Sequence, residues 1–233
     1  MRRPARYQSS ARFYDLISAE WPVYRAGRVA AIGLLAPGPG HHVLDIGCGT
    51  GLNFPHLQRR IGPTGSITAV DSSAQMLRQA RRKADSAGWN NVRLIQADAT
   101  QLNATQLNAT ALNAALNATA ENGTAASVTA PEPGAGFDAV ISTYALSLMA
   151  NWHLAVALMV AAARPAGRVG VVDMQKPVGP ARPWTPLAQL ACRLGGSDIE
   201  AHPWTAIEST LTDVRAMSLK GGHIQVRVGS VRE

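Results

Sequence analysis

The sequence of 233 residues has few cysteines and no long apolar run, and both absences limit what the protein can be. Its 2 cysteines, Cys48 and Cys192, are too few for a disulfide scaffold or a cysteine-based metal centre. No apolar stretch reaches the ~18 residues of a membrane-spanning helix, and no apolar signal segment follows the N-terminal arginines. We therefore expect a protein of the reducing cytoplasm that binds no metal.

Lysine is also scarce, since 19 of the 22 basic residues are arginine, and the net charge is +7. Such an excess can attract nucleic acid, anionic lipid or an acidic substrate, or it can reflect a GC-rich genome. The basic residues are scattered and lack the interleaved aromatic residues that stack on bases. The sequence thus argues against a nucleic-acid partner and leaves peripheral contact with an anionic membrane open. It does not determine the oligomeric state.

Short apolar runs alternate with amphipathic segments over much of the chain. Strands that are apolar on both faces and separated by helices indicate a parallel sheet between two helical layers. Near the end of the chain, two further strands around a Gly-Gly pair are typical of an antiparallel hairpin. The expected strands are 41–47, 65–71, 91–98, 137–146, 168–174, 213–220 and 223–230, and the expected helices between them are 52–62, 73–88 and 153–167.

Three segments do not fit this alternation. Residues 1–36 have helical spacing with a break near Pro22, and "APGPG" ends them, so we expect a helical cap in front of a main domain at 37–233. Residues 101–135 repeat leucine every five and then every four residues, a spacing that matches neither a helix face nor a strand face. We interpret them as a partly disordered surface insertion. Residues 175–210 begin with prolines and suggest a lid that lines a substrate site.

The motif "VLDIGCGTG", at 43–51, follows the first predicted strand. Gly47, Gly49 and Gly51 allow a tight turn and close approach of a ligand, and we expect them to present backbone N–H groups to a polar or anionic group. The dinucleotide fingerprint G-x-G-x-x-G is not met, because its last position is Leu52. The phosphate loop G-x-x-x-x-G-K-[ST] is absent as well.

Polar residues also end the next strands. Asp71 ends the second strand, where a carboxylate can hold both hydroxyls of a ribose or can cap the following helix. Asp98 ends the third strand and can accept a hydrogen bond from an adenine amino group. Thr143 and Tyr144 end the fourth. Because the carboxyl ends of parallel strands meet at one edge of the sheet, these residues are expected to surround one ligand.

Taken in order, these motifs resemble the class I S-adenosylmethionine-dependent methyltransferases. The resemblance extends from about Ala36 to Met174 and rests on "VLDIGCGTG", "ITAVDSS", "IQADAT", "FDAVISTYAL" and "RPAGRVGVVDM". It implies an α/β fold of the Rossmann-like, doubly wound kind, with a mostly parallel seven-stranded sheet and a C-terminal antiparallel hairpin. It also implies that residues 37–233 bind S-adenosylmethionine and release S-adenosylhomocysteine.

The resemblance places a set of residues at the cofactor. The glycine loop would face the methionine part, Asp71 the ribose, Asp98 the adenine edge and Thr143 the amino-acid end. At the front of the chain, "RFYDL" resembles the group that methylates quinones, phospholipids and other small molecules, and this segment would close over the cofactor. The residues implied for cofactor binding are Tyr14, Asp45, Gly47, Cys48, Gly49, Thr50, Gly51, Asp71, Ser72, Met76, Asp98, Ala99 and Thr143.

The expected activity is transfer of a methyl group to a small-molecule acceptor, with a lipid or quinone headgroup as one candidate. Catalysis would depend mainly on positioning, and a general base would help only with a protonated nucleophile. His153 and Tyr144 are candidates for that base, and Trp184 and Trp204 are candidate apolar walls of the acceptor site. Two alternatives stay open, a regulatory protein that binds the cofactor without turnover and an RNA-modifying methyltransferase.

Overall fold

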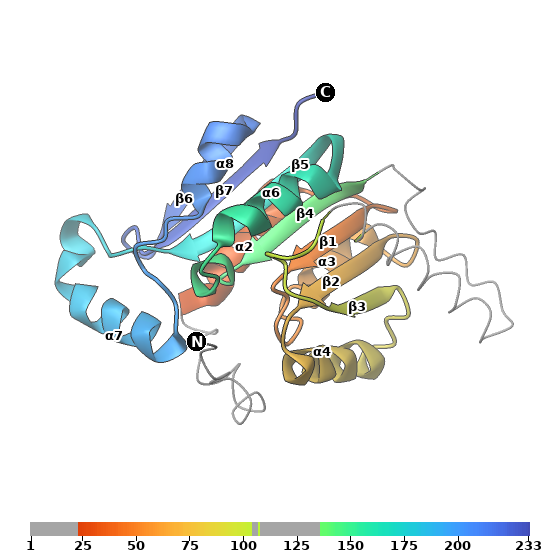
Figure 1. The fold of residues 1–233 in the computed structure, drawn as a ribbon, viewed down its shortest axis with the longest axis horizontal. Helices are drawn as coiled ribbons and strands as arrows, with labels where there is room; N and C mark the ends of the chain where they lie inside the picture. Colours follow the sequence, from red (N-terminus) through yellow and green to blue (C-terminus); the bar gives the residue numbers. More distant parts are fainter. Residues whose placement is uncertain (1–22, 104–106, 108–135) are drawn as a thin grey trace, which may run out of the picture.

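The computed structural model describes residues 23–103, 107 and 136–233. A seven-stranded sheet with the order β3-β2-β1-β4-β5-β7-β6 forms its centre (Figure 1). The strands are β1 (His42–Ile46), β2 (Ser66–Asp71), β3 (Val92–Gln96), β4 (Phe137–Thr143), β5 (Ala163–Met174), β6 (Thr212–Leu219) and β7 (Ile224–Ser230). The first five pair in parallel, whereas β7 runs antiparallel to both of its neighbours. The predicted doubly wound, mostly parallel sheet with an antiparallel hairpin is therefore confirmed.

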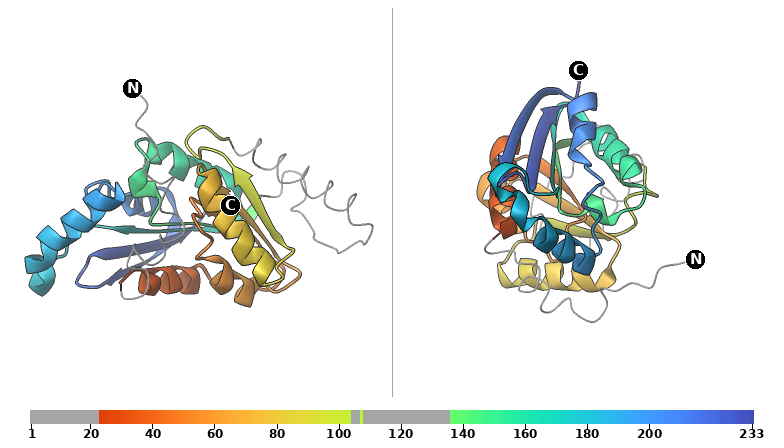
Figure 2. Two further views of the ribbon diagram at one scale, coloured as in Figure 1. Left: turned by 90° about the horizontal axis from the view of Figure 1, so that it is seen from below. Right: turned by 90° about the vertical axis from the view of Figure 1, so that its left-hand side faces the viewer.

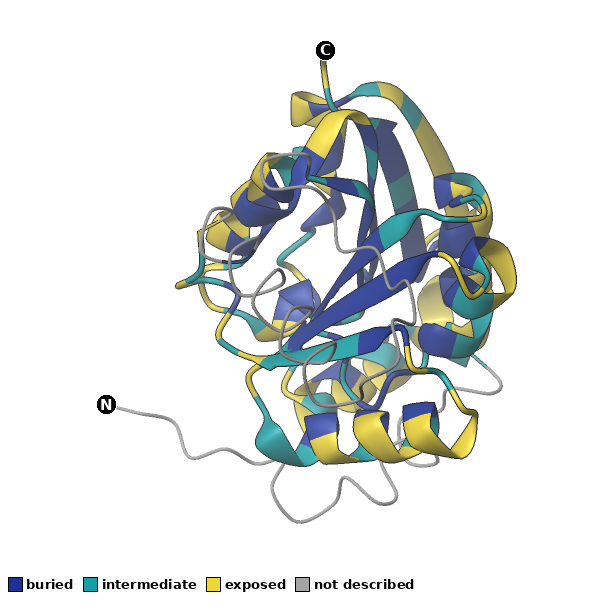
Figure 3. Cartoon of the chain, turned by 90° about the vertical axis from the view of Figure 1, so that its right-hand side faces the viewer, coloured by how far each residue is buried: buried dark blue, intermediate teal, exposed yellow. Residues whose placement is uncertain are grey.

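Helices cover both faces of this sheet (Figures 1 and 2). Helices α2 (Arg25–Leu35), α3 (Phe54–Ile61) and α4 (Ala74–Ser86) share one hydrophobic cluster with strand residues such as Val43 and Ile141. Helices α6 (Trp152–Ala162) and α8 (Trp204–Thr210) share a second cluster with residues such as Leu44 and Val140. Successive strand residues thus point into opposite layers, which is why the central strands are mostly apolar on both faces. The central strands are buried, whereas most of β6 and the outer helix faces are exposed (Figure 3).

Three element boundaries differ from the prediction by more than two residues. The helix expected over 153–167 ends at Ala162, and β5 already begins at Ala163. Pro165 explains the early end, because a proline disfavours helical backbone at the residue before it. The fourth strand ends at Thr143 rather than at residue 146, since Tyr144 has a φ of 58° and turns the chain out of the strand. The turn leads into the short 3-10 helix η2 (Leu146–Leu148).

The inserted segment 101–135 lies mostly outside the described residues, but one of its leucines does not. Leu107 is fully buried in the cluster formed with α6 and α8. Its backbone N–H donates to the carbonyl oxygen of Asn103 at 3.0 Å. The interpretation of the whole insertion as surface is therefore wrong at Leu107, which contributes an apolar side chain to the core.

The segment expected as a lid contains η3 (Gly179–Trp184), α7 (Thr185–Gly195) and α8. Helix α8 packs on the sheet, whereas η3 and α7 project from one end of the molecule (Figures 1 and 2). Among the described residues, no helix is both long enough and apolar enough to span a bilayer. The division into a cap at 1–36, a main domain at 37–233 and a lid at 175–210 remains a proposal.

Candidate functional site

The carboxyl ends of β1, β2 and β4 meet where the strand order of the sheet reverses, and this is where ligands of open α/β sheets bind. Strand β1 lies between the other two, with Ile46 opposite Val70 on β2 and Ser142 on β4. This register brings Asp45, Asp71 and Thr143 to one edge. The structure therefore brings together the residues that the sequence predicted at the first, second and fourth strand ends.

The backbone N–H groups of the glycine loop are occupied within the protein. Gly47 and Cys48 both donate to the carbonyl oxygen of Val70, at 2.8 and 3.0 Å. Gly49 donates to Oδ2 of Asp71 at 2.9 Å. The prediction that the loop presents free N–H groups to an anion is therefore wrong for these three residues, because the end of β2 accepts their hydrogen bonds.

The glycines are nevertheless required, for conformation and for space. Gly47, Gly49 and Gly51 have φ values of 68°, 54° and 77°, a region that side chains disfavour. A Cβ at Gly47 would lie 2.3 Å from Cβ of Ala145, whereas a Cβ at Gly49 would meet no heavy atom of the described residues within 4 Å. Packing thus requires glycine at position 47, and the loop at position 49 borders open space that a ligand can enter.

Asp71 connects the glycine loop to the start of α4. Its Oδ1 accepts from the N–H of Ser73 at 2.8 Å, and its Oδ2 accepts from Gly49. Burial raises the pKa of Asp71 above its ordinary value, and the two N–H donors partly offset that rise. The side chain that caps α4 is Ser73, whose hydroxyl accepts from the N–H of Met76. Asp71 is only half-buried, so its remaining lone pairs can still accept hydrogen bonds from a ligand.

Asp45 is fully buried below the loop. Its Oδ1 accepts from Nδ2 of Asn53 at 2.8 Å, whereas its Oδ2 has no hydrogen-bond partner in the part of the chain that the structure describes. Burial raises the pKa of Asp45 to about 7, although the Asn53 hydrogen bond and the nearby Arg28 charge oppose this rise. An acceptor that is buried without a donor is costly, so this oxygen is a reason to look for a ligand here.

Two residues that sequence reasoning missed complete this polar network. The buried Arg28, on α2, donates through one guanidinium nitrogen to Oδ1 of Asn53 at 2.8 Å and to Oγ1 of Thr143 at 2.5 Å. Its guanidinium also lies 5.7 Å from the ring centre of Tyr144. Asn53 could have been noticed because it directly follows the glycine motif. No local signal distinguishes Arg28 from the other 18 arginines.

The residues expected around an adenine follow the ends of the two neighbouring strands β2 and β3. Asp98 is exposed, and its carboxylate accepts from the N–H and the hydroxyl of Thr100 at 2.9 and 2.7 Å. Ala99 and Met76 are buried, while Ser72 is exposed. A flat apolar ring could thus be flanked by Met76 and held at its edge by Asp98.

The remaining residues of the predicted cofactor set have different surroundings. Thr50 and Cys48 are buried, and burial raises the pKa of the Cys48 thiol well above its ordinary value, so this thiol stays protonated. Thr143 is buried in the Arg28 network. Tyr14 lies outside the described residues.

The two candidate bases are separated in the structure. The Tyr144 hydroxyl donates to the carbonyl oxygen of Tyr24 at 2.7 Å, and its ring lies against that of Tyr24 with the centres 4.9 Å apart. His153 is exposed on α6, and its ring stacks on Trp152. Tyr144 therefore lies beside the Arg28 network, whereas His153 lies on the outer surface of a helix.

The two tryptophans expected as apolar walls of the acceptor site differ in burial. Trp204 is buried in the core cluster of α6 and α8, so its assignment to a substrate wall is wrong. The reason is that α8 packs on the sheet instead of standing over the strand ends. Trp184, at the end of η3, is 64% exposed.

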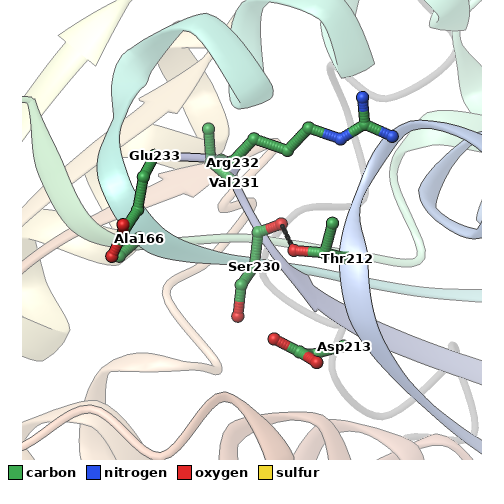
Figure 4. Close-up of a pocket in the computed structure, with 7 residues that line it drawn as sticks. All are labelled: Ala166, Thr212, Asp213, Ser230, Val231, Arg232 and Glu233. Carbon is green, nitrogen blue, oxygen red and sulfur yellow. Dashed lines mark hydrogen bonds between the residues drawn. The ribbon is translucent and has the colours of Figure 1, made fainter.

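A pocket of about 340 Å³ lies at the opposite edge of the sheet (Figure 4). It is lined by residues near the beginning of β5 and β6 and the end of β7, including Ala166, Thr212 and Ser230. Since β5 runs parallel to β1, this is the edge away from Asp45. The pocket is therefore unrelated to the constellation at the carboxyl ends.

Comparison with known proteins agrees with the fold and the motif. A family model described as "Methyltransferase domain" matches residues 43–110, which contain the glycine loop, Asp71 and Asp98. The resemblance to methyltransferases is therefore confirmed over these residues. The solved SAM-dependent methyltransferase from Aquifex aeolicus superposes on this chain with a TM-score of 0.58, covering 94% of this chain and 93% of that one. At 15% identity, this likeness supports the fold alone.

Curated relatives of the methyltransferase domain include ubiquinone/menaquinone biosynthesis C-methyltransferases UbiE. The protein from Stutzerimonas stutzeri is 29% identical over 174 residues, which cover 73% of this chain and 57% of the relative. The protein from Pasteurella multocida is 27% identical over 175 residues, which cover 74% of this chain and 55% of the relative. The match thus spans little more than half the length of these relatives.

Proposed function

We propose that the protein binds S-adenosylmethionine at the carboxyl ends of β1, β2 and β4 and transfers its methyl group to a small-molecule acceptor. The observation that carries this proposal is the glycine loop, which Asp71 holds through Gly49 and which borders open space at Gly49. A ligand approaching from that side would meet bare backbone, with one carboxylate beside it and another, Asp45, buried below it.

The charges around the loop favour a cation over a phosphate. Two carboxyl groups, Asp45 and Asp71, lie near the loop against one cation, Arg28, and the loop's N–H groups at 47–49 are already bonded. A phosphate would therefore find few free donors and two carboxylates that repel it. A sulfonium and an ammonium group fit this environment, and the buried Oδ2 of Asp45 still lacks a donor. The residues present thus fit S-adenosylmethionine better than a dinucleotide.

The proposed contacts follow from the position of each residue relative to the strand ends. Asp71 would accept hydrogen bonds from the ribose hydroxyls, with Ser72 and Met76 beside the base. Asp98 and Ala99 would hold the adenine edge. Thr143 would lie near the amino-acid end of the cofactor. The loop residues Gly47, Cys48, Gly49, Thr50 and Gly51 would line the methionine part, and Tyr14 remains a proposed contact from outside the described residues.

The bound cofactor would supply an already activated methyl group on its sulfonium. The protein's own task is then to align the acceptor and to exclude water. The rigid network of Arg28, Asn53 and Thr143 supports positioning, because it fixes the end of β4 to α2 and to the start of α3. The engaged hydroxyl of Tyr144 and the exposed position of His153 favour a mechanism without a dedicated protein base.

For the acceptor we propose a quinone-like small molecule handled in the cytoplasm, with peripheral contact to a membrane surface. The names of the curated relatives and their identities of 27 to 29% support a quinone-like acceptor. The net charge of +7 supports contact with an anionic surface.

Calorimetry with S-adenosylhomocysteine tests the cofactor site. Asp71→Ala should weaken binding by roughly 1–3 kcal/mol, through the loss of charge-assisted hydrogen bonds to the ribose. Asp85→Ala, which removes an exposed carboxylate on α4, is the matched control and should bind like the wild type. An unchanged dissociation constant for Asp71→Ala would refute the assignment.

Turnover separates an enzyme from a regulatory protein. The wild type should form S-adenosylhomocysteine when S-adenosylmethionine is supplied with a demethylated quinone precursor. Tight binding without product across a panel of such acceptors would instead identify a protein that only senses the cofactor.

A further inference from the structure

Helix α7 and the preceding η3 present an apolar stripe that nothing in the described residues covers. Four side chains form this stripe, and each is exposed to an unusual degree: Trp184 by 64%, Leu187 by 60%, Leu190 by 53% and Leu194 by 78%. Their spacing of three and four residues places the three leucines on one side of the helix. Exposed large apolar side chains that cluster in this way mark an interaction surface.

The opposite side of α7 is held in place by the protein. Cys192 is buried with Met174, the last residue of β5, and with Ile199. Tyr24 and Tyr144 pack against the same small cluster, and Tyr144 directly follows Thr143 of the candidate site. The stripe is therefore the outer surface of an element whose inner surface borders the site.

The charged side chains of η3 and α7 are all cations. Along residues 179–195 the only charged side chains are Arg182 and Arg193, both exposed cations. The exposed Lys220 lies in the turn against η3, where the carbonyl oxygen of the next residue, Gly221, accepts from the N–H of Val178. Of the two acids that directly follow α7, Glu200 pairs with Lys176, and the carboxylate of the exposed Asp198 accepts from the N–H of Glu200.

We propose that this stripe, with Arg182, Arg193 and Lys220, docks the protein on an anionic membrane surface. An amphipathic helix is held in the plane of a bilayer by leucines at the boundary of the acyl chains, a tryptophan at the interface and cations toward the headgroups. A second copy of this chain fits less well, because a twofold contact would bring the same cations against one another. Figures 1 and 2 show α7 at an extremity of the molecule, where a flat surface can reach it.

Docking through this stripe would place the candidate site close to lipophilic compounds dissolved in the bilayer. This consequence rests on the methyl transfer of the proposed function, whereas the docking itself rests only on the stripe and its cations. The membrane is then the source of the acceptor, and α7 separates the lipid from the strand ends that hold the cofactor.

Co-sedimentation of the full chain with lipid vesicles tests the proposal. The wild type should bind vesicles of phosphatidylcholine that contain about 30% phosphatidylglycerol and should bind pure phosphatidylcholine weakly. The triple variant Leu187→Gln, Leu190→Gln, Leu194→Gln should lose on the order of tenfold in binding to the anionic vesicles. The control is Leu154→Gln, which changes a leucine of α6 that is 54% exposed and should not alter binding.

A second pair of variants tests the charges. Arg182→Gln with Arg193→Gln should reduce binding to the anionic vesicles, whereas Arg59→Gln with Arg60→Gln, which removes two exposed cations of α3, should have little effect. Equal loss in both pairs would overturn the proposal, since binding would then depend on net charge alone.

Other outcomes overturn it as well. Absence of wild-type binding to the anionic vesicles, or equal binding of the leucine triple variant, contradicts membrane docking. Ultracentrifugation that finds a wild-type dimer and a monomeric triple variant would identify the stripe as a contact between two copies. Calorimetry with S-adenosylhomocysteine on the same samples separates the two ideas, because docking without cofactor binding would refute only the proposed function.

Discussion

The buried carboxyl group of Asp45 makes the stability of this protein depend on pH in a way that one substitution should remove. In the folded protein its pKa is about 7, and its ordinary value is 3.8. Between these values the folded state keeps a proton that the unfolded state has lost. Raising the pH through this window therefore lowers the free energy of unfolding.

The magnitude follows from the difference between the two pKa values. Each pH unit inside the window corresponds to about 1.4 kcal/mol, so the whole window corresponds to roughly 4 kcal/mol. Asp45→Asn keeps an oxygen that can accept the hydrogen bond from Asn53 and does not titrate. Its amide N–H₂ would replace the unpartnered Oδ2, at a cost of about 1–3 kcal/mol. Above pH 7 the variant should therefore be more stable than the wild type by ~1–3 kcal/mol.

Urea unfolding followed by tryptophan fluorescence measures this effect between pH 4 and pH 9. The stability of Asp45→Asn minus that of the wild type should rise from pH 4 to about pH 7 and then level off. Taking this difference cancels the opposite contributions of His42 and His223, whose pKa values are lowered by burial. A difference that does not vary with pH, or one that favours the wild type as the pH rises, would refute the account of Asp45.

The same variant links stability to ligand binding. If the charge of Asp45 favours a cationic cofactor, Asp45→Asn should bind S-adenosylmethionine more weakly even where it is the more stable protein. Such opposition is common where a strained or unsatisfied group serves a binding site.

Two further predictions concern the glycine loop and the inserted segment. Gly49→Ala should keep the fold and lose cofactor affinity, because its Cβ would enter open space beside the loop. Gly47→Ala should fail to fold or lose several kcal/mol of stability, because its Cβ would clash with Ala145. Thermal melts and calorimetry distinguish the two variants, and a well-folded Gly47→Ala would contradict the packing. Leu107→Ala should destabilise the protein by about 2–5 kcal/mol because the side chain is fully buried, and a loss below about 0.5 kcal/mol in urea unfolding would place Leu107 outside the core.

The sequence by itself determined the order of strands and helices along the chain and the polar residues that follow the strands. Apolar runs such as 43–46 and 67–70 could be recognised as strands, since burial on both faces leaves a continuous apolar pattern. Asp71, Asp98 and Thr143 could be predicted at one sheet edge because parallel strands end on the same side. These inferences succeed because they depend on neighbours in sequence and on the general rules of parallel sheets.

Only the tertiary structure decided which groups have free hydrogen-bonding capacity. The N–H groups of the glycine loop proved to be bonded to Val70 and Asp71, and Arg28 proved to join Asn53 and Thr143 in a buried network. These contacts join residues that lie between 22 and 115 positions apart, so no local pattern encodes them. Burial was also decided only by the tertiary structure. Trp204 faces the core and Trp184 faces outward, because α8 packs on the sheet and η3 does not. Composition and spacing do not determine this packing.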